Sequence, residues 1–459
     1  MSSSSELEQP RGIDGSPSSR RAHPGVWTTA LVVLVIVPLG LSVGVGQLAG
    51  EHGGMKWELG LGAGLVALSL LVATFALPSR LKVLTSHLGL ENVLRAHRAI
   101  ALLAVGFVLL HVALVLVSNP KRLRILDLRH APPRVWAACI ATLAVLLVVA
   151  LAATRRRRRP RYEGWRLVHV VLGSTVLGAS GLHILWLHGL VDRTLTRVWF
   201  AFLATLVVGL FGYRWLWRPL RSSRRSYVVE DVRVESPTAV NVAVRAQSHK
   251  GIAFQPGQFV WLKIGESPFV FEEHPFTIAS SASDPARKEF TVKALGDFSE
   301  LLRAMRPGRR VYLDGPHGRF TVDDTRGRGV VFIAGGVGIT PMLSMIRTLA
   351  DRHDRRKLLL VAGGRTIDEL LHREEVDALR AEVDLTVVEV PHNPPEEWAG
   401  ESGFVNAELL ERYVPHIRHR RRHDYFICGP PPMVAAVLGA LHELRVPDRR
   451  IHTELFDMV

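Results

Sequence analysis

Four histidines inside long apolar segments are the residues of this chain best suited to bind metal. His97 and His111 lie on one segment, His169 and His183 lie on another, and fourteen residues separate the members of each pair. Fourteen residues are close to four helical turns, so both members of a pair point in nearly the same direction, roughly 21 Å apart along the axis. Two such helices side by side could hold one haem near each membrane face, with an imidazole on either side of each iron.

The alternative is that each histidine is an ordinary polar residue packed between helices. Ionisable residues at membrane depth are uncommon and usually functional, and the equal spacing on two segments favours ligands. His188 is a rival outer ligand, although it has no partner at matching depth on the other segment. Arg98 and Arg166, at the inner ends of the two segments, could pair with haem propionates or extend toward lipid headgroups.

Cysteine usage narrows the kinds of cofactor that this chain of 459 residues could bind. Cys139 and Cys428 are its two cysteines. Two thiols cannot form a disulfide framework, a zinc site of several thiolates or an iron–sulfur cluster held by four cysteines. Because the sequence has no CxxCH motif, any haem would be bound without a covalent link, as haem b.

The formal net charge of +15 could suggest a nucleic-acid partner. The basic residues, however, cluster at the ends of apolar segments, where the positive-inside rule expects them. The charge therefore predicts a lipid bilayer as the partner and no nucleic acid.

Six apolar segments are long enough to cross a membrane, and they predict a six-helix transmembrane bundle over residues 25–220. A tail rich in Ser, Arg and Pro, residues 1–24, is expected to be disordered and cytoplasmic. The arginine run 155–161 and the arginines after the last segment place the second half of the chain in the cytoplasm, although the basic loop 119–134 argues against this. The expected spans are 26–49, 58–78, 94–118, 135–153, 165–187 and 197–217.

The second half of the chain reads as two domains. Residues 226–325 contain short strand-like segments separated by turns, which predicts an antiparallel β-barrel. Residues 326–459 repeat the order strand, glycine-rich loop and helix, which predicts an α/β domain with a parallel sheet. The loop 335–341 could approach a dinucleotide pyrophosphate at a helix N-terminus, although it departs from the GxGxxG pattern.

Six short motifs occur in a fixed order: HPFTIASS, VKALGDFS, GPHGRF, GGVGITP, CGPPPM and ELF. In this order they resemble the ferredoxin–NADP reductase superfamily over residues 226–459. Together with the paired histidines, the whole chain resembles the NADPH oxidase and ferric reductase family of transmembrane flavocytochromes b. In that family a ferric reductase-like membrane domain is fused to a flavin- and nicotinamide-binding module.

The resemblance implies roles for particular residues. The FAD-binding residues would be His274, Pro275, Phe276, Thr277, Lys293, Gly296 and Ser299. The dinucleotide-phosphate loop would comprise Gly335, Gly336, Gly338, Thr340 and Pro341. The nicotinamide side would comprise Cys428, Gly429, Pro430 and the flavin-shielding Phe456, with Thr277, Cys428 and Phe456 nearest the chemistry. Arg365 resembles the residue that contacts the 2′-phosphate of NADPH, and a solvated arginine, with NADH as the donor, is its alternative.

The resemblance also implies a multi-pass enzyme of the cell membrane with FAD, two haems b and NADPH. Electrons from cytoplasmic NADPH would reach an acceptor at the outer face, either oxygen, giving superoxide, or a ferric chelate. A third hypothesis makes the membrane half a mere anchor for a flavin reductase with a cytoplasmic partner. A fourth, a non-catalytic redox subunit, would be expected to lack some of these motifs.

Overall fold

The computed structural model describes most of the chain. The described residues are 29, 32–41, 54–81, 90–118, 127, 129–158, 162–187, 193–293, 297–414 and 420–455. Statements about structure below refer to these residues. The expected tail 1–24, the rival ligand His188 and most of the loop 119–134 lie outside them.

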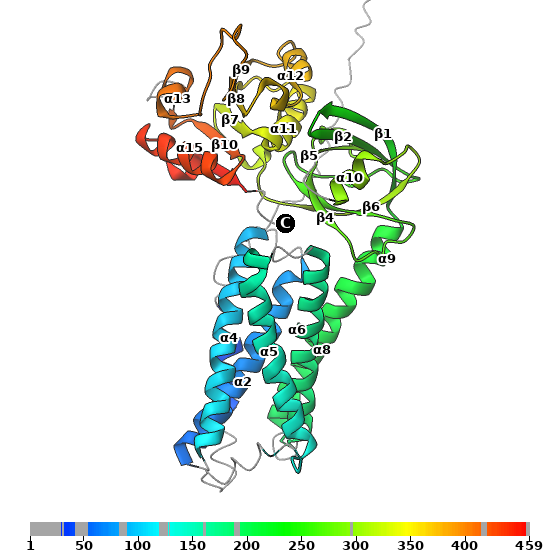
Figure 1. Cartoon of the computed structure of the whole chain (residues 1–459), viewed down its shortest axis with the longest axis vertical. Helices are drawn as coiled ribbons and strands as arrows, with labels where there is room; N and C mark the ends of the chain where they lie inside the picture. The colour runs from blue at the N-terminus through cyan, green and yellow to red at the C-terminus, as the bar shows by residue number, and fades with distance from the viewer. Residues whose placement is uncertain are drawn as a thin grey trace, which may run out of the picture.

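Five helices are long and apolar enough to span a membrane. They run side by side as a bundle (Figure 1). A 3₁₀ turn, η1 (Leu77–Ser79), follows the first helix, and the last continues through a π-helical turn, η3 (Tyr213–Trp217), into α9 (Arg218–Ser223). The five helices are α2 (Gly54–Ala76), α4 (Leu90–Ser118), α5 (Pro133–Arg158), α6 (Tyr162–Leu185) and α8 (Thr194–Gly212).

The described structure does not establish a six-helix count. Of the predicted first span, 26–49, the described part is a shorter apolar helix, Val32–Leu41. The other five predicted spans each coincide with one of the long helices.

Glycines let two of the helices approach closely. A Cβ added at Gly60 would lie 3.2 Å from the Cβ of Leu114, and one at Gly64 would lie 2.7 Å from Nδ1 of His111. Small residues spaced by four are a common device for close contact between membrane helices. Here they bring α2 against the face of α4 that carries His111.

The first sheet has six strands in the order β4-β3-β6-β1-β2-β5, and its ladders are antiparallel. All six were predicted as strands. A backbone hydrogen bond from Ala279 N to Glu289 O joins the two edges, but no ladder joins them among the described residues, so a closed barrel is not established. The strands are β1 (Ser226–Ser236), β2 (Ala239–Ala246), β3 (Phe259–Ile264), β4 (His274–Thr277), β5 (Arg287–Lys293) and β6 (Arg310–His317), and α10 (Asp297–Arg303) follows β5.

The second sheet is parallel, with the order β11-β10-β7-β8-β9, as the repeated strand, loop and helix pattern predicted. One apolar core packs α11 and α12 on one face, and a second packs α13 and α15 on the other. The elements are β7 (Gly329–Gly335), α11 (Ile339–Asp351), β8 (Lys357–Gly364), α12 (Arg373–Leu379), β9 (Leu385–Pro391), α13 (Ala407–Tyr413), β10 (His423–Cys428), α15 (Pro431–Glu443) and β11 (Ile451–Glu454), with short 3₁₀ turns η4 (Val322–Asp324), η5 (Gly336–Gly338), η6 (Ile367–Glu369) and η7 (Asp448–Arg450).

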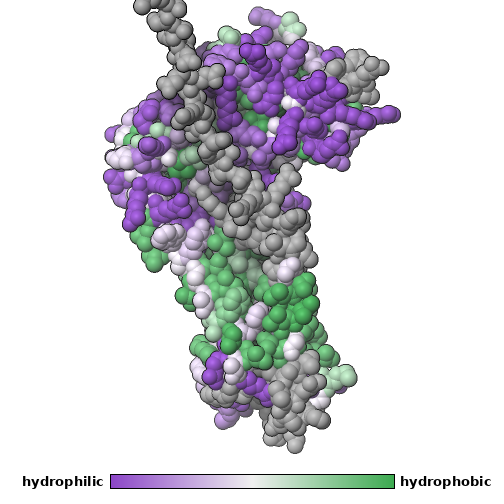
Figure 2. All heavy atoms as spheres, turned by 180° about the vertical axis from the view of Figure 1, so that it is seen from behind, coloured by the Kyte–Doolittle hydropathy of each residue, from purple (hydrophilic) through white to green (hydrophobic). Residues whose placement is uncertain are grey.

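Both sheets lie at the same end of the bundle, and α9 leads directly from the last membrane helix toward β1 (Figure 1). Hydrophobic side chains gather over the helices and hydrophilic side chains over the sheets (Figure 2). The surface therefore divides into a zone suited to lipid and a zone suited to water.

Candidate functional site

The histidine pair nearer the sheets brings two imidazoles close together, with their planes tilted. His97 on α4 and His169 on α6 have ring centroids 6.2 Å apart, with their planes inclined by 58°. Nδ1 of His97 lies 2.9 Å from the carbonyl oxygen of Thr74, while Nδ1 of His169 is buried without a hydrogen-bond partner. We call this the inner pair.

The outer pair is built from the same helices, nearer their far ends. Nδ1 of His111 lies 2.7 Å from the carbonyl oxygen of Gly60, and Nδ1 of His183 lies 2.8 Å from that of Arg134. Helix α4 therefore carries one member of each pair, and α6 carries the other.

The hydrogen bonds indicate whether these residues suit a metal-bound cofactor. A carbonyl oxygen can only accept, so His97, His111 and His183 must each carry their proton on Nδ1, which leaves Nε2 with a free lone pair. Ligating histidines usually show this arrangement. Two metal–imidazole bonds of about 2 Å each and the half-widths of two rings add up to about 6 Å, close to the spacing of the inner pair. The residues fit a haem held by two imidazoles.

Aromatic rings connect the inner pair to the first sheet. Trp165 stacks on His169 with ring centroids 5.1 Å apart, and Tyr162 stacks on Trp165 at 6.2 Å. Tyr162 in turn lies 6.3 Å from the ring of His274, the first residue of β4. The predicted inner ligand and the predicted flavin motif are therefore joined by consecutive ring contacts.

The predicted flavin residues His274, Pro275, Phe276 and Thr277 form β4, at an edge of the first sheet. The first three are half-buried and Thr277 is buried, so this edge leaves an aromatic ring accessible to a flat cofactor. The ring of Phe298 on α10 lies 4.0 Å from His274 and stacks on Phe276 at 5.9 Å. Sequence reasoning did not single out Phe298, although it lies within the second flavin motif.

Two carboxylates face His274. Its Nε2 lies 3.2 Å from Glu163 at the start of α6 and 3.6 Å from Glu272. Burial lowers the pKa of His274 although both carboxylates oppose this effect. At neutral pH we therefore treat this imidazole as neutral.

The second flavin motif is described only in part. Lys293 ends β5, and its Nζ lies 3.6 Å from the carboxylate of Glu369 in the parallel-sheet domain. Ser299 is half-buried on α10. The prediction for Gly296 lies outside the described residues.

The structure brings together the two glycine-containing loops predicted to bind nicotinamide dinucleotide. A Cβ at Gly338 would collide with the carbonyl of Cys428, and one at Gly429 would lie 3.1 Å from the backbone nitrogen of Gly335. Gly336 has a φ of 55°, which favours glycine. The predicted loop therefore lies between β7 and α11 and contacts the segment Cys428–Pro430.

The other predicted residues of this domain differ in exposure. Thr340, in the first turn of α11, is buried and donates from Oγ1 to Val337 O at 2.9 Å, and Pro341 follows it in the same turn. Arg365 is exposed just after β8. Cys428 is fully buried, and burial raises the pKa of its thiol well above the usual range, so the sulfur stays protonated. Phe456 lies outside the described residues.

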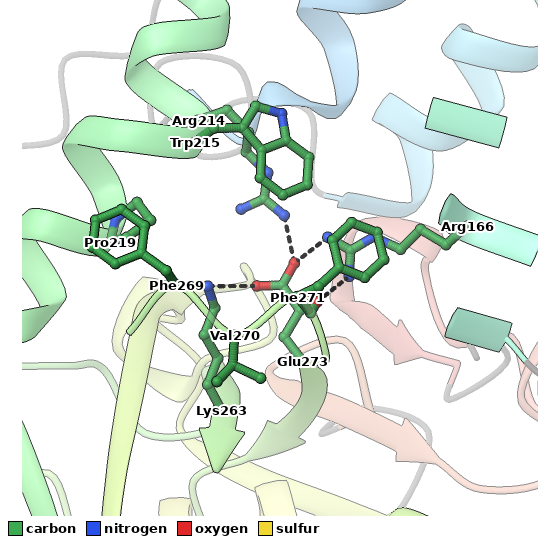
Figure 3. A pocket seen from close by; sticks show the side chains of 9 residues that line it. All are labelled: Arg166, Arg214, Trp215, Pro219, Lys263, Phe269, Val270, Phe271 and Glu273. Carbon is green, nitrogen blue, oxygen red and sulfur yellow. Dashed lines mark hydrogen bonds and ion pairs between the residues drawn. The ribbon is translucent and has the colours of Figure 1, made fainter. Parts of the chain in front are cut away.

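A buried ionic cluster, which sequence reasoning missed, joins the bundle to the first sheet. Glu273, one residue before β4, has a side chain only 1% exposed and accepts from Arg166 at 2.6 Å, Arg80 at 2.8 Å and Arg214. Lys263 on β3 lies 3.7 Å from its second oxygen. Figure 3 shows Arg166 and Arg214 reaching the carboxylate from the helices and Lys263 reaching it from the sheet.

A second carboxylate extends this cluster. Asp314 on β6 pairs with Arg218 and lies 3.4 Å from Arg80. Burial alone would raise the pKa values of Glu273 and Asp314, but the surrounding arginines hold both below their usual range. Both carboxylates therefore stay charged at neutral pH.

Comparison with known proteins matches three regions of the chain to domain families. Residues 63–180 match the family described as "Ferric reductase like transmembrane component", residues 228–319 match "FAD-binding domain" and residues 332–438 match "Oxidoreductase NAD-binding domain".

Individual relatives cover part of the chain. NADH-cytochrome b5 reductase 1 of Cryptococcus neoformans is 32% identical over 194 residues, 40% of this chain and 66% of that protein. The glycine betaine monooxygenase reductase subunit of Pseudomonas aeruginosa is 32% identical over 211 residues, 44% of this chain and 56% of that protein. The Amycolatopsis cytochrome P450 reductase GcoB superposes with a TM-score of 0.45 and 27% identity, over 50% of this chain and 69% of that one.

The domain order and the five apolar helices define a membrane oxidoreductase with FAD- and NAD-binding domains. This order of domains is the architecture of the NADPH oxidase and ferric reductase family. The resemblance inferred from the sequence motifs is thereby confirmed.

Proposed function

We propose that this enzyme transfers electrons from NADPH, through FAD and two haems b, to an acceptor on the opposite side of the membrane. When bound, FAD would take a hydride from the nicotinamide and pass single electrons on to haem iron. His97 and His169 would hold the inner haem, and His111 and His183 the outer one. FAD would lie along β4, with Lys293, Gly296 and Ser299 near its pyrophosphate and Phe456 shielding its ring.

The observation that supports this proposal is the series of ring contacts from β4 to the inner pair. His274, Tyr162, Trp165 and His169 follow one another with centroid distances of 6.3, 6.2 and 5.1 Å. If the helices only anchored the flavin domain, its cofactor motif would not need to contact a helix that carries histidines. This contact favours electron transfer into the membrane over a cytoplasmic partner.

On the donor side, Gly335, Gly336, Gly338, Thr340 and Pro341 would bind the dinucleotide phosphates, and Cys428, Gly429 and Pro430 would border the nicotinamide. The buried, protonated thiol of Cys428 would pack beside the nicotinamide as an uncharged group. Arg365 is exposed just after β8, and a guanidinium suits a 2′-phosphate, which favours NADPH. The first relative is named as an NADH enzyme, so NADH is the competing donor.

Charge supports a cytoplasmic location for the two sheet domains. Arg155 near the end of α5, Arg166 near the start of α6 and Arg218 on α9 all belong to the end of the bundle that bears the sheets. Arginines concentrate on the cytoplasmic side of membrane proteins. We therefore propose a multi-pass protein of the cell membrane, with the outer pair near the external face.

The acceptor is proposed to be oxygen, giving superoxide. With two imidazoles from this chain on each iron, no coordination position would be left, so the acceptor would be reduced without binding to the metal. One-electron reduction of oxygen suits this arrangement. A ferric chelate is the second candidate, because the membrane region matches a family described as ferric reductase-like.

The test is to reduce the purified holoenzyme with NADPH under anaerobic conditions and then to mix it with oxygen or with ferric citrate. We expect oxygen to reoxidise it faster, with superoxide as the product. Faster reoxidation by ferric citrate would assign the ferric reductase activity instead. The variant His111→Leu should keep NADPH-dependent reduction of the inner haem but lose reoxidation by either acceptor, and unchanged reoxidation would contradict the proposed route.

A further inference from the structure

Glu273 contacts arginines from three separate parts of the membrane region. Arg80 follows the turn after α2, Arg166 lies on α6 and Arg214 lies on the π-helical turn η3. These arginines are 193, 107 and 59 residues from Glu273 in the sequence. One side chain of the flavin domain therefore holds three membrane segments at once.

The charge balance makes this carboxylate essential to the cluster. Five cationic side chains surround two carboxylates, Glu273 and Asp314; the cations are Arg80, Arg166, Arg214, Arg218 and Lys263. Removing the charge of Glu273 would deprive Arg166 of its carboxylate partner and leave Arg80, Arg214 and Arg218 to share Asp314, in a medium that solvates cations poorly. Without Glu273, the three arginines would repel one another and the contact between bundle and sheet would weaken.

The contact is also placed where it can set the distance between two redox centres. Arg166 precedes His169 by three residues on α6, so both lie on the same side of the helix, one turn apart. Glu273 immediately precedes His274, the first residue of the flavin motif. The bond between Arg166 and Glu273 therefore ties the inner ligand helix to the flavin strand within a few residues of both sites.

Neighbouring contacts strengthen this tie. Arg166 also donates to the carbonyl oxygen of Phe271 at 3.3 Å and lies over the Phe271 ring. Arg80 lies over the ring of Trp261 on β3, with its guanidinium carbon 3.5 Å from the centroid. Trp215 beside Arg214 stacks on Phe271, with rings 5.6 Å apart and inclined by 2°. The cluster is thus packed between aromatic rings, which favours a rigid interface between the bundle and the first sheet.

We propose that Glu273 is a positioning residue, which fixes the flavin domain on the membrane bundle and so sets the geometry of electron transfer from FAD to the inner haem. The inference rests on the proposed function for its redox role. The docking role rests on the contacts alone. It assigns Glu273 no part in hydride transfer, which takes place between the nicotinamide and the flavin.

The test compares Glu273→Gln with Glu266→Gln in the full-length holoenzyme. Glu266 belongs to the same domain and pairs with Arg309 at 3.0 Å, but its side chain is 77% exposed, so its loss should have little effect. Stopped-flow absorbance would follow flavin reduction by NADPH and haem reduction separately. For Glu273→Gln we expect an unchanged rate of flavin reduction and about a tenfold slower haem reduction, because small displacements of reacting centres have large effects on rate.

Two further measurements separate positioning from folding. Glu273→Asp, which keeps the charge, should recover part of the haem-reduction rate, whereas a purely steric role would give no such recovery. If Glu273→Gln loses its FAD or haem, the variant Arg214→Gln is used instead, which removes one of the three arginines. In that variant haem reduction should again be slower and flavin reduction unchanged, with a smaller effect on haem reduction. Equal slowing of flavin and haem reduction, or wild-type rates for both, would overturn the proposal.

Hydrogen exchange tests docking without any haem. In Glu273→Gln the backbone amides of β4 and of the segment 265–273 should exchange faster than in Glu266→Gln, while β7 and β8 stay unchanged. A protein that binds no haem yet shows this difference would refute the proposed function and leave the docking role standing. Unchanged exchange in β4, beside normal haem content, would refute the docking role alone.

Discussion

Three of the four membrane histidines donate from Nδ1 to a backbone carbonyl: His97 to Thr74, His111 to Gly60 and His183 to Arg134. The spacing of the histidines was readable from the sequence because a helix repeats every 3.6 residues. The carbonyl partners were not, because they lie on other helices. These hydrogen bonds are the strongest structural argument that the imidazoles present Nε2 to a metal.

Arg365 can be tested at the scale of one residue. If its guanidinium binds the 2′-phosphate, Arg365→Ala should raise KM for NADPH about ten- to a hundredfold, as expected for loss of a charge-assisted hydrogen bond worth about 1.5–3 kcal/mol, and should leave KM for NADH unchanged. Arg355 is exposed just before β8, at the opposite end of the same strand, so Arg355→Ala is a matched control. Steady-state kinetics with both nucleotides gives the answer, and equal effects on the two KM values would remove Arg365 from the phosphate site.

Helix packing determines whether the outer pair can form. Gly64 on α2 faces His111, and an added Cβ would lie 2.7 Å from Nδ1 and 2.9 Å from Cε1 of that ring. Contacts under 3.0 Å require the ring or the helix to move. The close approach of α2 and α4 therefore depends on glycine at position 64, which has no side chain.

We accordingly expect Gly64→Ala to lose the outer haem and to retain the inner one, so that haem content falls by about half. A haem assay on purified protein checks this result. Gly106 on α4 has nothing within 4 Å of an added Cβ, so Gly106→Ala should keep the wild-type haem content. Wild-type haem content in Gly64→Ala would contradict the placement of His111.

The first sheet contains a buried lysine that should make its stability depend on pH. Lys288 on β5 is fully buried, and its Nζ donates to the carbonyl oxygens of Ile252 at 2.9 Å and Pro285 at 3.0 Å. Burial lowers the pKa of Lys288 to about 7. Its pKa in the unfolded chain is about 10.4, so between about pH 7 and 10 the unfolded chain binds more protons, and this residue makes the fold more stable as pH rises.

Lys288→Met should remove that contribution. The Tm of the wild type minus that of the variant should therefore increase as pH rises from 7 to 9.5. Unfolding can be monitored by the increase in FAD fluorescence on heating. The sign of the absolute difference is secondary, because the variant also leaves two carbonyl oxygens without a donor. A difference independent of pH would mean that Lys288 titrates normally in the fold.

At the scale of the whole molecule, the sequence predicted local elements better than the contacts between them. The strands of the first sheet, the strands β7, β8 and β10 of the second and five of the spans follow from hydrophobic periodicity and glycine-rich turns, which are local properties. The strands β9 and β11 were not predicted individually. Closure of the first sheet was predicted as a barrel, but it depends on how the edges β4 and β5 meet, which periodicity does not determine. Of the predicted first span, the described residues contain only Val32–Leu41.

The joint between bundle and flavin domain could not be read from the sequence. Arg80, Arg166 and Arg214 looked like ordinary basic residues at the ends of apolar segments, which the positive-inside rule already explained. Their common partner, Glu273, is up to 193 residues away. The sequence shows an acidic residue directly before the flavin motif. It does not show that this residue is buried, because burial depends on the fold.

The most direct test of this account is the haem content of the purified full-length protein, measured with its reduced-minus-oxidised absorbance spectrum. We predict a b-type spectrum and about two haems per chain, with one haem retained in each of the variants His97→Leu and His111→Leu. A colourless protein, or a haem content that neither substitution changes, would contradict the central claim that the two histidine pairs hold haem.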